Sequence, residues 1–507
     1  MPLLASIPIL VILVLMVGYR WGAARAGAAG YLAALVVAIL FFGAGPDVLA
    51  YAHVKGLILT FDVLFIVWAA FLLYRVADEA GAIKVIGQAL PNLTTDKGMQ
   101  AILIGWVFAS FLQGAGGFGV PVAVTAPLLV GMGFSPLTAV VVPSIGHGWA
   151  VTFGSLGSSF QALMSSTGLD QSVLAPGAAL FLGISALVTG PMVAHAADGW
   201  AGVRRLTVKA LILGGVMGAV QYAIAVAGLW NIAAFGGGLA GLIVSVPLAR
   251  WGQTGNGSGK RTDGKKLFVA LSAYFILVAL TVVILLVPAV KDFMGQAALQ
   301  VQFPETVTSL GYVSPAEANR PVRIFTHAGA ILLYTSIIAF FVYCRAGLCK
   351  VGAVKAILSD TVKKMMASSL SILEMVAMAT VMQQAGMTEA LAQGLAGAVG
   401  AAFPVIAPWI GGIGAFMTGS NTNSNVVFGA LQMRTAELLS LSVPLILAGQ
   451  TAGAALASVA APTKVVVGAS TAGMAGKEGE VLRALLGYIV LLLLLISGLT
   501  LLGIWLF

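Results

Sequence analysis

Two hydrophobic stretches of this 507-residue chain are interrupted in the middle by residues that do not continue a helix. Residues 113–121 read Gln-Gly-Ala-Gly-Gly-Phe-Gly-Val-Pro, and residues 419–425 read Gly-Ser-Asn-Thr-Asn-Ser-Asn. Glycine and proline end helices, and Ser, Thr and Asn side chains compete for backbone hydrogen bonds. Because lipid cannot satisfy freed backbone groups, such interruptions are tolerated only inside protein or beside a wet cavity. We therefore predict two re-entrant hairpins, 99–132 and 404–433.

The composition places most of the remaining chain in a lipid bilayer. It is 60% hydrophobic and 8% charged, whereas soluble proteins hold about 25% charged residues. The fold class predicted is an all-α polytopic membrane protein with about twelve transmembrane helices and the two hairpins. The spans lie near residues 2–18, 27–44, 56–74, 137–160, 175–196, 207–229, 230–249, 268–290, 325–344, 365–384, 438–462 and 484–506.

The net charge of +9 is spread over loops between these spans, so it indicates membrane orientation and not a nucleic-acid partner. Loops rich in Lys and Arg stay in the cytoplasm, and all of them fall on one side if each hairpin returns to the side it entered from. They contain Arg20, Arg25, Arg75, Lys84, Lys97, Arg204, Arg205, residues 250–266, residues 345–364, Lys477 and Arg483. The N-terminus and the loop 291–323 are then expected outside.

This topology makes the two hairpins enter the membrane from opposite sides. It predicts two inverted repeats, 1–196 and 268–507, joined by linking helices and a cytoplasmic loop within 197–267. Interrupted segments at corresponding positions of two inverted halves are typical of the substrate site of a secondary transporter.

The sequence offers little to support other classes of protein. Four histidines and two cysteines at unrelated positions form no constellation for catalysis or metal binding, and no phosphate-binding loop occurs, so we expect no enzyme, cofactor or ATP-driven pump. Cys344 and Cys349 stand beside Arg345 and Lys350 at a predicted cytoplasmic helix end, where thiols stay reduced. We expect two free, inert thiols there.

The glycines of the first interruption are candidate substrate-binding positions. Bare backbone N–H groups can approach a ligand there, and the helix that resumes near Val122 adds a positive N-terminal dipole that favours a carboxylate. The alternative is a glycine seam for close helix packing. A dinucleotide site is not expected, because no strand precedes the glycines. The candidates are Gly114, Gly116, Gly117 and Gly119.

The second interruption supplies six consecutive polar side chains amid hydrophobic sequence. Their hydroxyl and amide groups can donate to and accept from a carboxylate or a hydroxyl ligand. An ordinary surface loop is the alternative, but no charged residue lies nearby. The candidates are Ser420, Asn421, Thr422, Asn423, Ser424 and Asn425.

Four ionisable residues lie within predicted spans or at their ends, where such residues are candidates for function. They are Asp62, His147, Glu374 and Lys464. Glu374 is the deepest in its span, and Lys464 either marks a cytoplasmic helix end or offsets the charge of a substrate. A carboxylate or histidine that changes protonation is what proton coupling requires. Structural hydrogen bonds and snorkelling to the interface remain alternatives for each.

Several of these motifs together resemble the lactate permease family, bacterial proton-coupled carriers of lactate and glycolate. The matching segments are 111–123 (Phe-Leu-Gln-Gly-Ala-Gly-Gly-Phe-Gly-Val-Pro-Val-Ala), 128–134 (Leu-Leu-Val-Gly-Met-Gly-Phe), 419–425 (Gly-Ser-x-Thr-x-Ser-Asn), 428–432 (Phe-Gly-Ala-Leu-Gln) and 476–478 (Gly-Lys-Glu). They cover both halves of the chain. The resemblance implies a multi-pass protein of the bacterial inner membrane that imports a small 2-hydroxy monocarboxylate with protons.

Two positions depart from the pattern of the family. The resemblance implies Glu in many relatives where this chain has Gln113, and Asp where it has Asn421. If those acids carry protons in the relatives, coupling here must use other groups, with Glu374, Asp62 and His147 as candidates. A sodium-coupled carrier of another short organic anion is the main alternative, and a channel is a second. The sequence leaves formation of a homodimer open.

Overall fold

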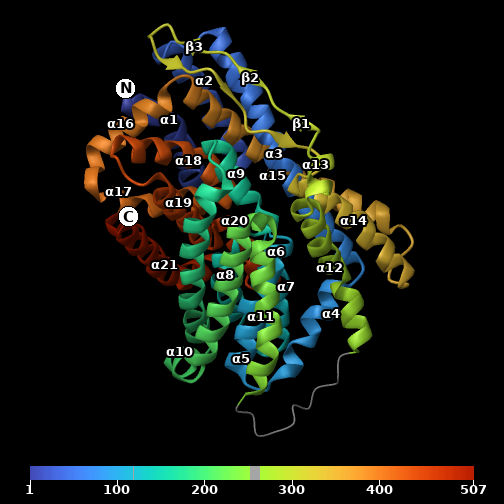
Figure 1. The fold of residues 1–507 in the computed structure, drawn as a ribbon. Coiled ribbons are helices and arrows are strands. Elements are labelled where there is room, and N and C mark those ends of the chain that lie inside the picture. The colour runs from blue at the N-terminus through green and yellow to red at the C-terminus, as the bar shows by residue number, and fades with distance from the viewer. Residues whose placement is uncertain (118, 252–262, 507) are drawn as a thin grey trace.

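The computed structural model describes residues 1–117, 119–251 and 263–506, and it is a bundle of helices with a narrow β-ribbon along one edge (Figure 1). Phe118 in the first interruption and most of the predicted cytoplasmic loop 250–266 lie outside the described residues. Among the described residues, 11 helical stretches are long and apolar enough to cross a membrane. The chain is therefore the all-α polytopic membrane protein that its sequence predicts.

The first half of the chain contains the helices of the first predicted repeat and the linking helices. Those helices are α1 (Pro2–Leu13), α2 (Ala23–Phe41), α3 (Pro46–Glu79), α4 (Ala82–Ala89), α5 (Lys97–Ala101), α6 (Ala109–Ala115), α7 (Val120–Gly131), α8 (Pro136–His147), α9 (Ser158–Thr167), α10 (Gln171–Ile224) and α11 (Ala233–Arg250). A π-helical segment, Ile102–Phe108, joins α5 to α6. Helix α10 bends at Asp198 and Gly199, so it accounts for two of the predicted spans.

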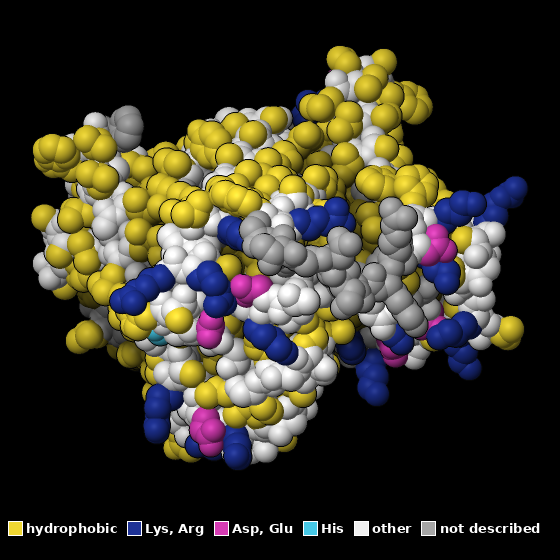
Figure 2. Space-filling model, turned by 90° about the horizontal axis from the view of Figure 1, so that it is seen from below, with side chains coloured by type: hydrophobic (Ala, Val, Ile, Leu, Met, Phe, Trp, Pro, Cys, Tyr) yellow, Lys and Arg dark blue, Asp and Glu magenta, His cyan; other side chains and the backbone are white. Residues whose placement is uncertain are grey.

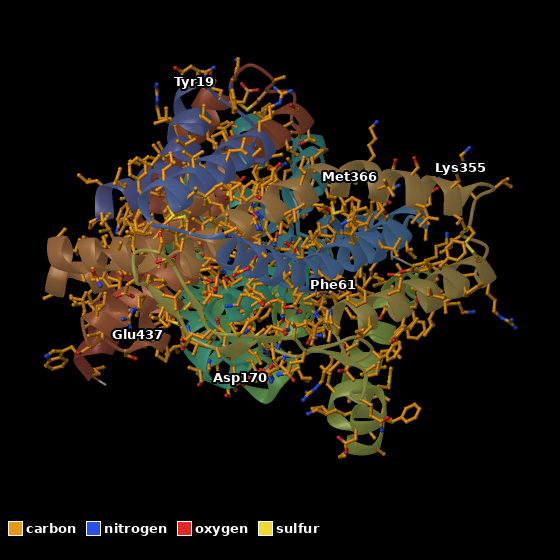
Figure 3. The ribbon with its side chains drawn as sticks, turned by 90° about the horizontal axis from the view of Figure 1, so that it is seen from above. Tyr19, Phe61, Asp170, Lys355, Met366 and Glu437 are labelled. Atoms are coloured by element: carbon orange, nitrogen blue, oxygen red, sulfur yellow. A yellow bond between two sulfur atoms is a disulfide. The ribbon has the colours of Figure 1, made fainter. Side chains whose placement is uncertain are left out.

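The second half begins with two helices before the ribbon and continues with eight after it. These are α12 (Gly264–Leu286), α13 (Pro288–Met294), α14 (Ala328–Arg345), α15 (Ala353–Gln384), α16 (Met387–Val399), α17 (Phe403–Thr418), α18 (Asn421–Leu438), α19 (Val443–Ala457), α20 (Pro462–Thr471) and α21 (Glu478–Leu506). Seen from above, α15 runs from Lys355 at the edge of the molecule past Met366 toward its centre (Figure 3). At 32 residues it exceeds the roughly 20 needed to cross a bilayer.

Both predicted hairpins are present. Helices α5 and α6 lead into the molecule and α7 returns, and the Lys97 ammonium donates to the carbonyl of Met132, which brings the two ends of the hairpin together. Helices α17 and α18 form the second hairpin and pack along each other. Asp96 caps α5 by accepting from the Met99 N–H at 3.0 Å, and Ser420 caps α18 by accepting from the Asn423 N–H at 3.2 Å.

Two further spans, predicted at 137–160 and 438–462 as single helices, are each broken in the middle. Helix α8 ends at His147 and α9 begins at Ser158, while α19 ends at Ala457 and α20 begins at Pro462. Ser155 and Leu156 have φ angles of +48° and +53° in the first break. Strained backbone of this kind clusters at functional sites. The prediction of continuous helices is wrong here, because Gly, Ser and Pro end both inner helices before they cross.

The same order of elements occurs twice along the chain. A long helix, a short helix, a hairpin, a broken helix and a closing helix follow one another from α3 to α10, and again from α15 to α21. This repetition is what two inverted repeats require. The division into 1–196, 197–267 and 268–507 stays a prediction.

The surface also fits a membrane protein. Large apolar side chains are exposed along many helices, as at Leu3, Leu40 and Trp505. The face seen from below gathers more Lys and Arg than Asp and Glu side chains around the grey segment (Figure 2). By the positive-inside rule we expect this face to be cytoplasmic and the ribbon side to be external.

The external loop and the cysteines differ from expectation. Strands pair antiparallel as β1 (Ala298–Leu299) with β6 (Val322–Arg323), β2 (Gln302–Phe303) with β5 (Glu317–Ala318), and β3 (Thr306–Val307) with β4 (Val313–Ser314), which makes one nested ribbon. Cys344 and Cys349 form a disulfide, so the prediction of free thiols is wrong. The left-handed turn at Gly347 brings their Cα atoms to 4.6 Å.

Candidate binding site

Four helices begin at the tips of the hairpins and at the breaks of the two interrupted spans, three of them at buried residues and α20 at an exposed proline. They are α7 at Val120, α9 at Ser158, α18 at Asn421 and α20 at Pro462. A helix N-terminus carries unsatisfied N–H groups and a partial positive charge, so it stabilises a nearby anion. Contacts described below bring these four starts into one region.

The first hairpin tip fits tightly against the break between α8 and α9. Gly117 has a φ of +59°, and a Cβ atom on it would overlap the hydroxyl oxygen of Ser155. The same hydroxyl donates to the carbonyl of Gly116 at 3.4 Å. Gly119 has a φ of +82° but open space around it. This tip therefore presents backbone, and only glycine fits at its closest approach.

Gly114 lies behind the tip and has a different role. A Cβ atom on it would lie 2.5 Å from the backbone of Phe235 in α11. The glycine-seam alternative therefore describes Gly114, while the turn belongs to Gly116, Gly117 and Gly119.

The second hairpin tip is joined to the break between α8 and α9 through side chains. The Asn421 amide donates to Thr152 Oγ1 at 3.0 Å. Thr422 Oγ1 and Ser159 Oγ lie 3.0 Å apart. Both hairpin tips thus meet the same broken span from different directions.

Helix α20 begins beside the second tip and carries a partly buried cation. A Cβ atom on Gly419 would overlap Thr463 Oγ1, and the neighbouring Lys464 donates to Ser458 Oγ at 3.0 Å. Within the described residues no carboxylate forms an ion pair with Lys464. His147, at the end of α8, is close enough for the Lys464 charge to act on it. Its Nδ1 bonds the Pro143 carbonyl at 2.6 Å, and its Nε2 has no partner.

Two amide oxygens of the second tip are buried without a hydrogen-bond partner. They are Oδ1 of Asn421 and Oδ1 of Asn423, on side chains 2% and 3% exposed. The Asn423 amide nitrogen donates to Ser371 Oγ at 2.9 Å, which fixes the side chain. Because buried polar atoms are nearly always paired, both oxygens are acceptors that a ligand donor or a cation can use.

Other residues of the second tip act structurally. Ser424 Oγ donates to the carbonyl of Gly411 at 2.8 Å. The Asn425 amide donates to the Ser159 carbonyl and to Thr451 Oγ1, each at 2.9 Å. These bonds satisfy backbone groups that the hairpin and the broken helix leave open.

Two of the predicted proton-coupling residues lie away from the tips. Asp62 contacts His327 at the start of α14, 2.9 Å from carboxylate oxygen to imidazole nitrogen. Glu374 packs against Gly27 in α2, and its Oε2 has no partner. Of the four candidates, the structure brings Lys464 and His147 to the tips and keeps Asp62 and Glu374 apart from them.

Sequence reasoning missed Thr152, Ser155 and Ser159, which hold both tips. The break in this span could have been suspected from its glycines at 148, 154 and 157 and its paired serines. Within an apolar run, however, these residues are equally typical of close helix packing.

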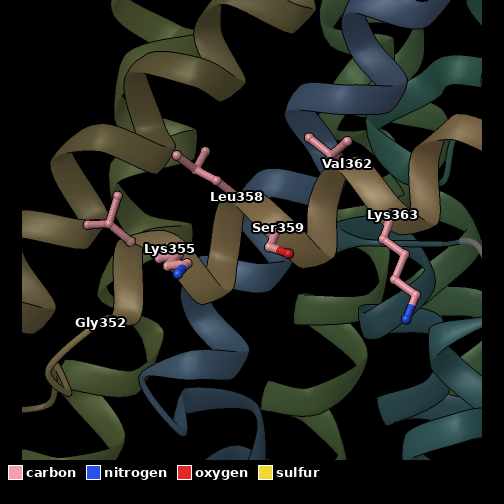
Figure 4. A pocket seen from close by; sticks show the side chains of 7 residues that line it. Gly352, Lys355, Leu358, Ser359, Val362 and Lys363 are labelled. Atoms are coloured by element: carbon pink, nitrogen blue, oxygen red, sulfur yellow. The ribbon is translucent and has the colours of Figure 1, made fainter.

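The cavities of the described chain add one feature near the tips. A cavity of about 660 Å³ lies under the ribbon and is lined by Asp62, Ser165, Arg320 and Arg434 among others. We call it the external vestibule. A second hollow, over the first turns of α15, is lined by side chains of that single helix, including Lys355 and Lys363 (Figure 4). No second element converges on that hollow, so it does not make a substrate site.

The sequence profile of the L-lactate permease family matches residues 2–507. The chain belongs to the L-lactate permease family. The glycolate permease GlcA of Escherichia coli is 27% identical to it over 100% of this chain and 96% of the relative. L-lactate permeases of Salmonella typhimurium and Bacillus subtilis are each 26% identical over 95% and 96% of this chain and 92% of each relative.

A solved structure of the YdaH transporter from Alcanivorax borkumensis covers 88% of this chain and 86% of its own, with a TM-score of 0.48 and 17% identity. That likeness is too remote to bear on the site. Membership of the family makes the chain a transporter and not an enzyme, and a multi-pass protein of the bacterial inner membrane.

Proposed function

We propose that this family member takes up a small 2-hydroxy monocarboxylate, such as lactate or glycolate, together with protons. The full-length relatives named for L-lactate and for glycolate support the substrate class. The geometry supports an anion, because four helix N-termini and one cation meet where two hairpins and two broken helices come together.

The observation that carries the proposal is the Lys464 ammonium, held by Ser458 Oγ with no ion-pair partner in the described structure. Lys464 is partly buried, so its ammonium has lost part of its hydration and gains from a partner of opposite charge. A carboxylate substrate beside Lys464 would offset part of that loss for both charges. The substrate would complete a pair that the protein alone leaves open.

The polar tip would hold the rest of the ligand. The unpartnered oxygen of Asn421 would accept from the 2-hydroxyl group, while the N–H group of Gly119 would donate to the carboxylate. This division places the charge of the substrate near the positive helix ends and its hydroxyl near the amides.

The charge of the substrate gives a reason for coupling its uptake to protons. A monocarboxylate carries one negative charge, so moving it with one proton is electroneutral. The buried Asp62 and His147 and the partly buried Glu374 and Lys464 are the ionisable groups that could carry the proton.

Uptake into proteoliposomes tests the proposal. Radiolabelled lactate should accumulate when an inward proton gradient is imposed and not when a sodium gradient is imposed alone. Competition by a panel of short carboxylates should be strongest for glycolate and other 2-hydroxy acids. Sodium-driven uptake that is insensitive to pH would contradict proton coupling, and absence of competition by 2-hydroxy acids would contradict the substrate class.

Replacing Lys464 with Met tests whether this ammonium pairs with the substrate carboxylate. A hydrogen bond to a charged group contributes about 1.5–3 kcal/mol, so the apparent affinity for lactate should fall roughly tenfold or more. Lys355→Met, on the exposed start of α15, removes the same charge away from the site. Equal affinities in the two variants would remove Lys464 from the site.

A sodium-coupled carrier is the second candidate, and one observation favours it. The unpartnered amide oxygen of Asn421, and likewise that of Asn423 on another face of α18, is a ligand that suits a hard cation. The sodium-gradient arm of the same experiment separates this candidate from proton coupling.

A further inference from the structure

Asp62 and His327 form a buried pair that the binding site does not use. Asp62 stands in the middle of α3, and His327 caps α14 by accepting from the Gly329 N–H at 3.2 Å. Their side chains are each 7% exposed, and carboxylate and imidazole are 2.9 Å apart. The imidazole also stacks on Phe65, with ring centres 5.1 Å apart. A paired acid and imidazole inside a membrane span are candidates for a proton relay.

The other carboxylate oxygen of Asp62 is held by α9. Gln161 Nε2 donates to it at 2.5 Å, and Ser165 Oγ donates to it as well. Near its start α9 also holds the second hairpin tip, through Ser159 and Thr422. One ten-residue helix therefore contacts the proposed substrate site at Ser159 and the Asp62–His327 pair from Gln161 and Ser165, about half a turn and nearly two turns later.

The pair can reach external water. Asp62 and Ser165 line the external vestibule beneath the ribbon. In Figure 3, Phe61, the neighbour of Asp62, is labelled on α3, and Asp170 is labelled just beyond α9. A proton that enters from outside meets Asp62 before it meets the hairpin tips.

The other charged groups of the vestibule already have partners of opposite charge. Those ion pairs are Lys55–Glu317, Arg434–Glu389 and Arg320–Asp170. Helix α9 offers no titratable group, and α15 contributes the uncharged Thr380, Gln383 and Gln384 to the lining. Among the described lining residues, Asp62 is the carboxylate without a Lys or Arg partner.

Two groups near the vestibule do not compete for a proton near neutral pH. The backbone N–H of Ser172 holds the pKa of Asp170 below its usual value, so this carboxylate stays ionised. Burial raises the pKa of Tyr312, so its hydroxyl stays neutral.

We propose that the Asp62–His327 pair is the external proton-binding site of this transporter and that its protonation frees α9 to move with the second hairpin tip. The inference rests on the proposed proton coupling. One proton from external water adds one positive charge to the pair, which cancels the single negative charge of a monocarboxylate. Protonated Asp62 accepts hydrogen bonds less well, so the bonds from Gln161 and Ser165 weaken and α9 loosens from α3.

Asp62→Asn and His327→Gln test the inference in proteoliposomes, against Asp47→Asn at the exposed start of α3 and His53→Gln further along that helix. Lactate exchange at equal pH measures substrate binding and carrier movement, and accumulation driven by a proton gradient measures coupling. In the Asp62 and His327 variants exchange should persist, while gradient-driven accumulation should fall at least about tenfold. Both control variants should accumulate lactate as the unmodified protein does.

Three outcomes distinguish the possibilities. If the unmodified protein shows no proton-driven accumulation, the proposed function fails before the pair is tested. If accumulation survives in Asp62→Asn and His327→Gln, the pair is not the proton site, and loss in Glu374→Gln instead would assign the role to that residue. If either pair variant fails to fold, Ser165→Ala decides.

Ser165→Ala keeps both charges and removes one donor to the ionised carboxylate. The protonated form is then favoured, so the pH of half-maximal uptake should rise by about one unit, as expected for one charge-assisted hydrogen bond. Ser135→Ala, at the start of α8, removes an exposed hydroxyl as a control. An unchanged pH profile in Ser165→Ala would overturn the proposal.

Discussion

The tips of the two hairpins are held in place by different kinds of contact. The apolar window within Lys97–Ala115, the first arm, is 94% buried, and α17, the arm that leads into the second tip, has 10 buried residues among its 16. The first tip is glycine backbone wedged against Ser155, and the second is a row of amides and hydroxyls. The first tip is therefore held by the fit of its backbone against a neighbour. The second tip is held by side-chain hydrogen bonds.

Both hairpins are packed against the rest of the bundle. The first packs on α11, and the second packs on α9 and α19. At the second tip, side-chain hydrogen bonds that each contribute about 1 kcal/mol net join the hairpin to the span that is broken after His147. We expect substitutions at the first tip to act through steric fit and those at the second through affinity.

The largest effect is expected for Gly117→Ala. The new Cβ would overlap the Ser155 hydroxyl at a backbone φ of +59°, so the tip could not close on the broken span. We expect lactate uptake in proteoliposomes to be lost while the protein still elutes as a single species in detergent.

A second substitution separates steric fit from general damage. Ser155→Gly removes the side chain that is overlapped, and glycine suits the φ of +48° at that position. The double variant Gly117→Ala with Ser155→Gly should regain a substantial part of the uptake. If uptake does not recover in the double variant, the overlap between residue 117 and the Ser155 side chain is not what stops transport.

Asn421→Ala should have the next largest effect. The substitution removes both the donor to Thr152 and the unpartnered oxygen assigned to the substrate hydroxyl. Two hydrogen bonds at about 1 kcal/mol each predict a rise in apparent KM of roughly tenfold or more. Thr435→Ala, which removes a buried hydroxyl on the same helix that bonds within it, is the matched control. An equal KM in both variants would mean that the polar tip does not bind substrate.

The hairpins could be predicted from sequence because their signal is local. Gly, Pro, Ser and Asn within apolar runs cannot continue a helix in lipid, and the distribution of Lys and Arg fixes the side of each loop. The same reasoning gave Asn421, and it identified Lys464 as a possible counter-charge. The break after His147 escaped it, because glycines in an apolar run serve equally in close helix packing.

The partner of Asp62 escaped prediction for a different reason. His327 is 265 residues away in the sequence, and alone at the start of a span it has no pattern that marks it. The same holds for the disulfide, since two cysteines in a basic loop carry no sign of the turn that joins them. Contacts between distant segments require the fold, whereas interruptions of a helix do not.

A smaller effect, on stability rather than affinity, is expected for Asn425→Ala. Its amide holds the Ser159 carbonyl and Thr451 Oγ1, so the substitution leaves buried groups without partners. We expect the melting temperature in detergent to fall, at a cost of about 1–3 kcal/mol, while the KM for lactate changes less than in Asn421→Ala. A larger change in KM than in Asn421→Ala would reverse the assignment of the two asparagines.

The smallest effect is expected for Gly119→Ala, and it sharpens the contrast between the two kinds of constraint. Gly119 shares the left-handed backbone of Gly117, with a φ of +82°, but nothing lies within 4 Å of the place where its Cβ would be. Only the backbone conformation opposes the change, at a cost of about 1–2 kcal/mol. Uptake should therefore fall by less than about tenfold, whereas Gly117→Ala abolishes it. Equal losses at the two positions would mean that the left-handed turn itself, and not the contact with Ser155, decides the shape of the first tip.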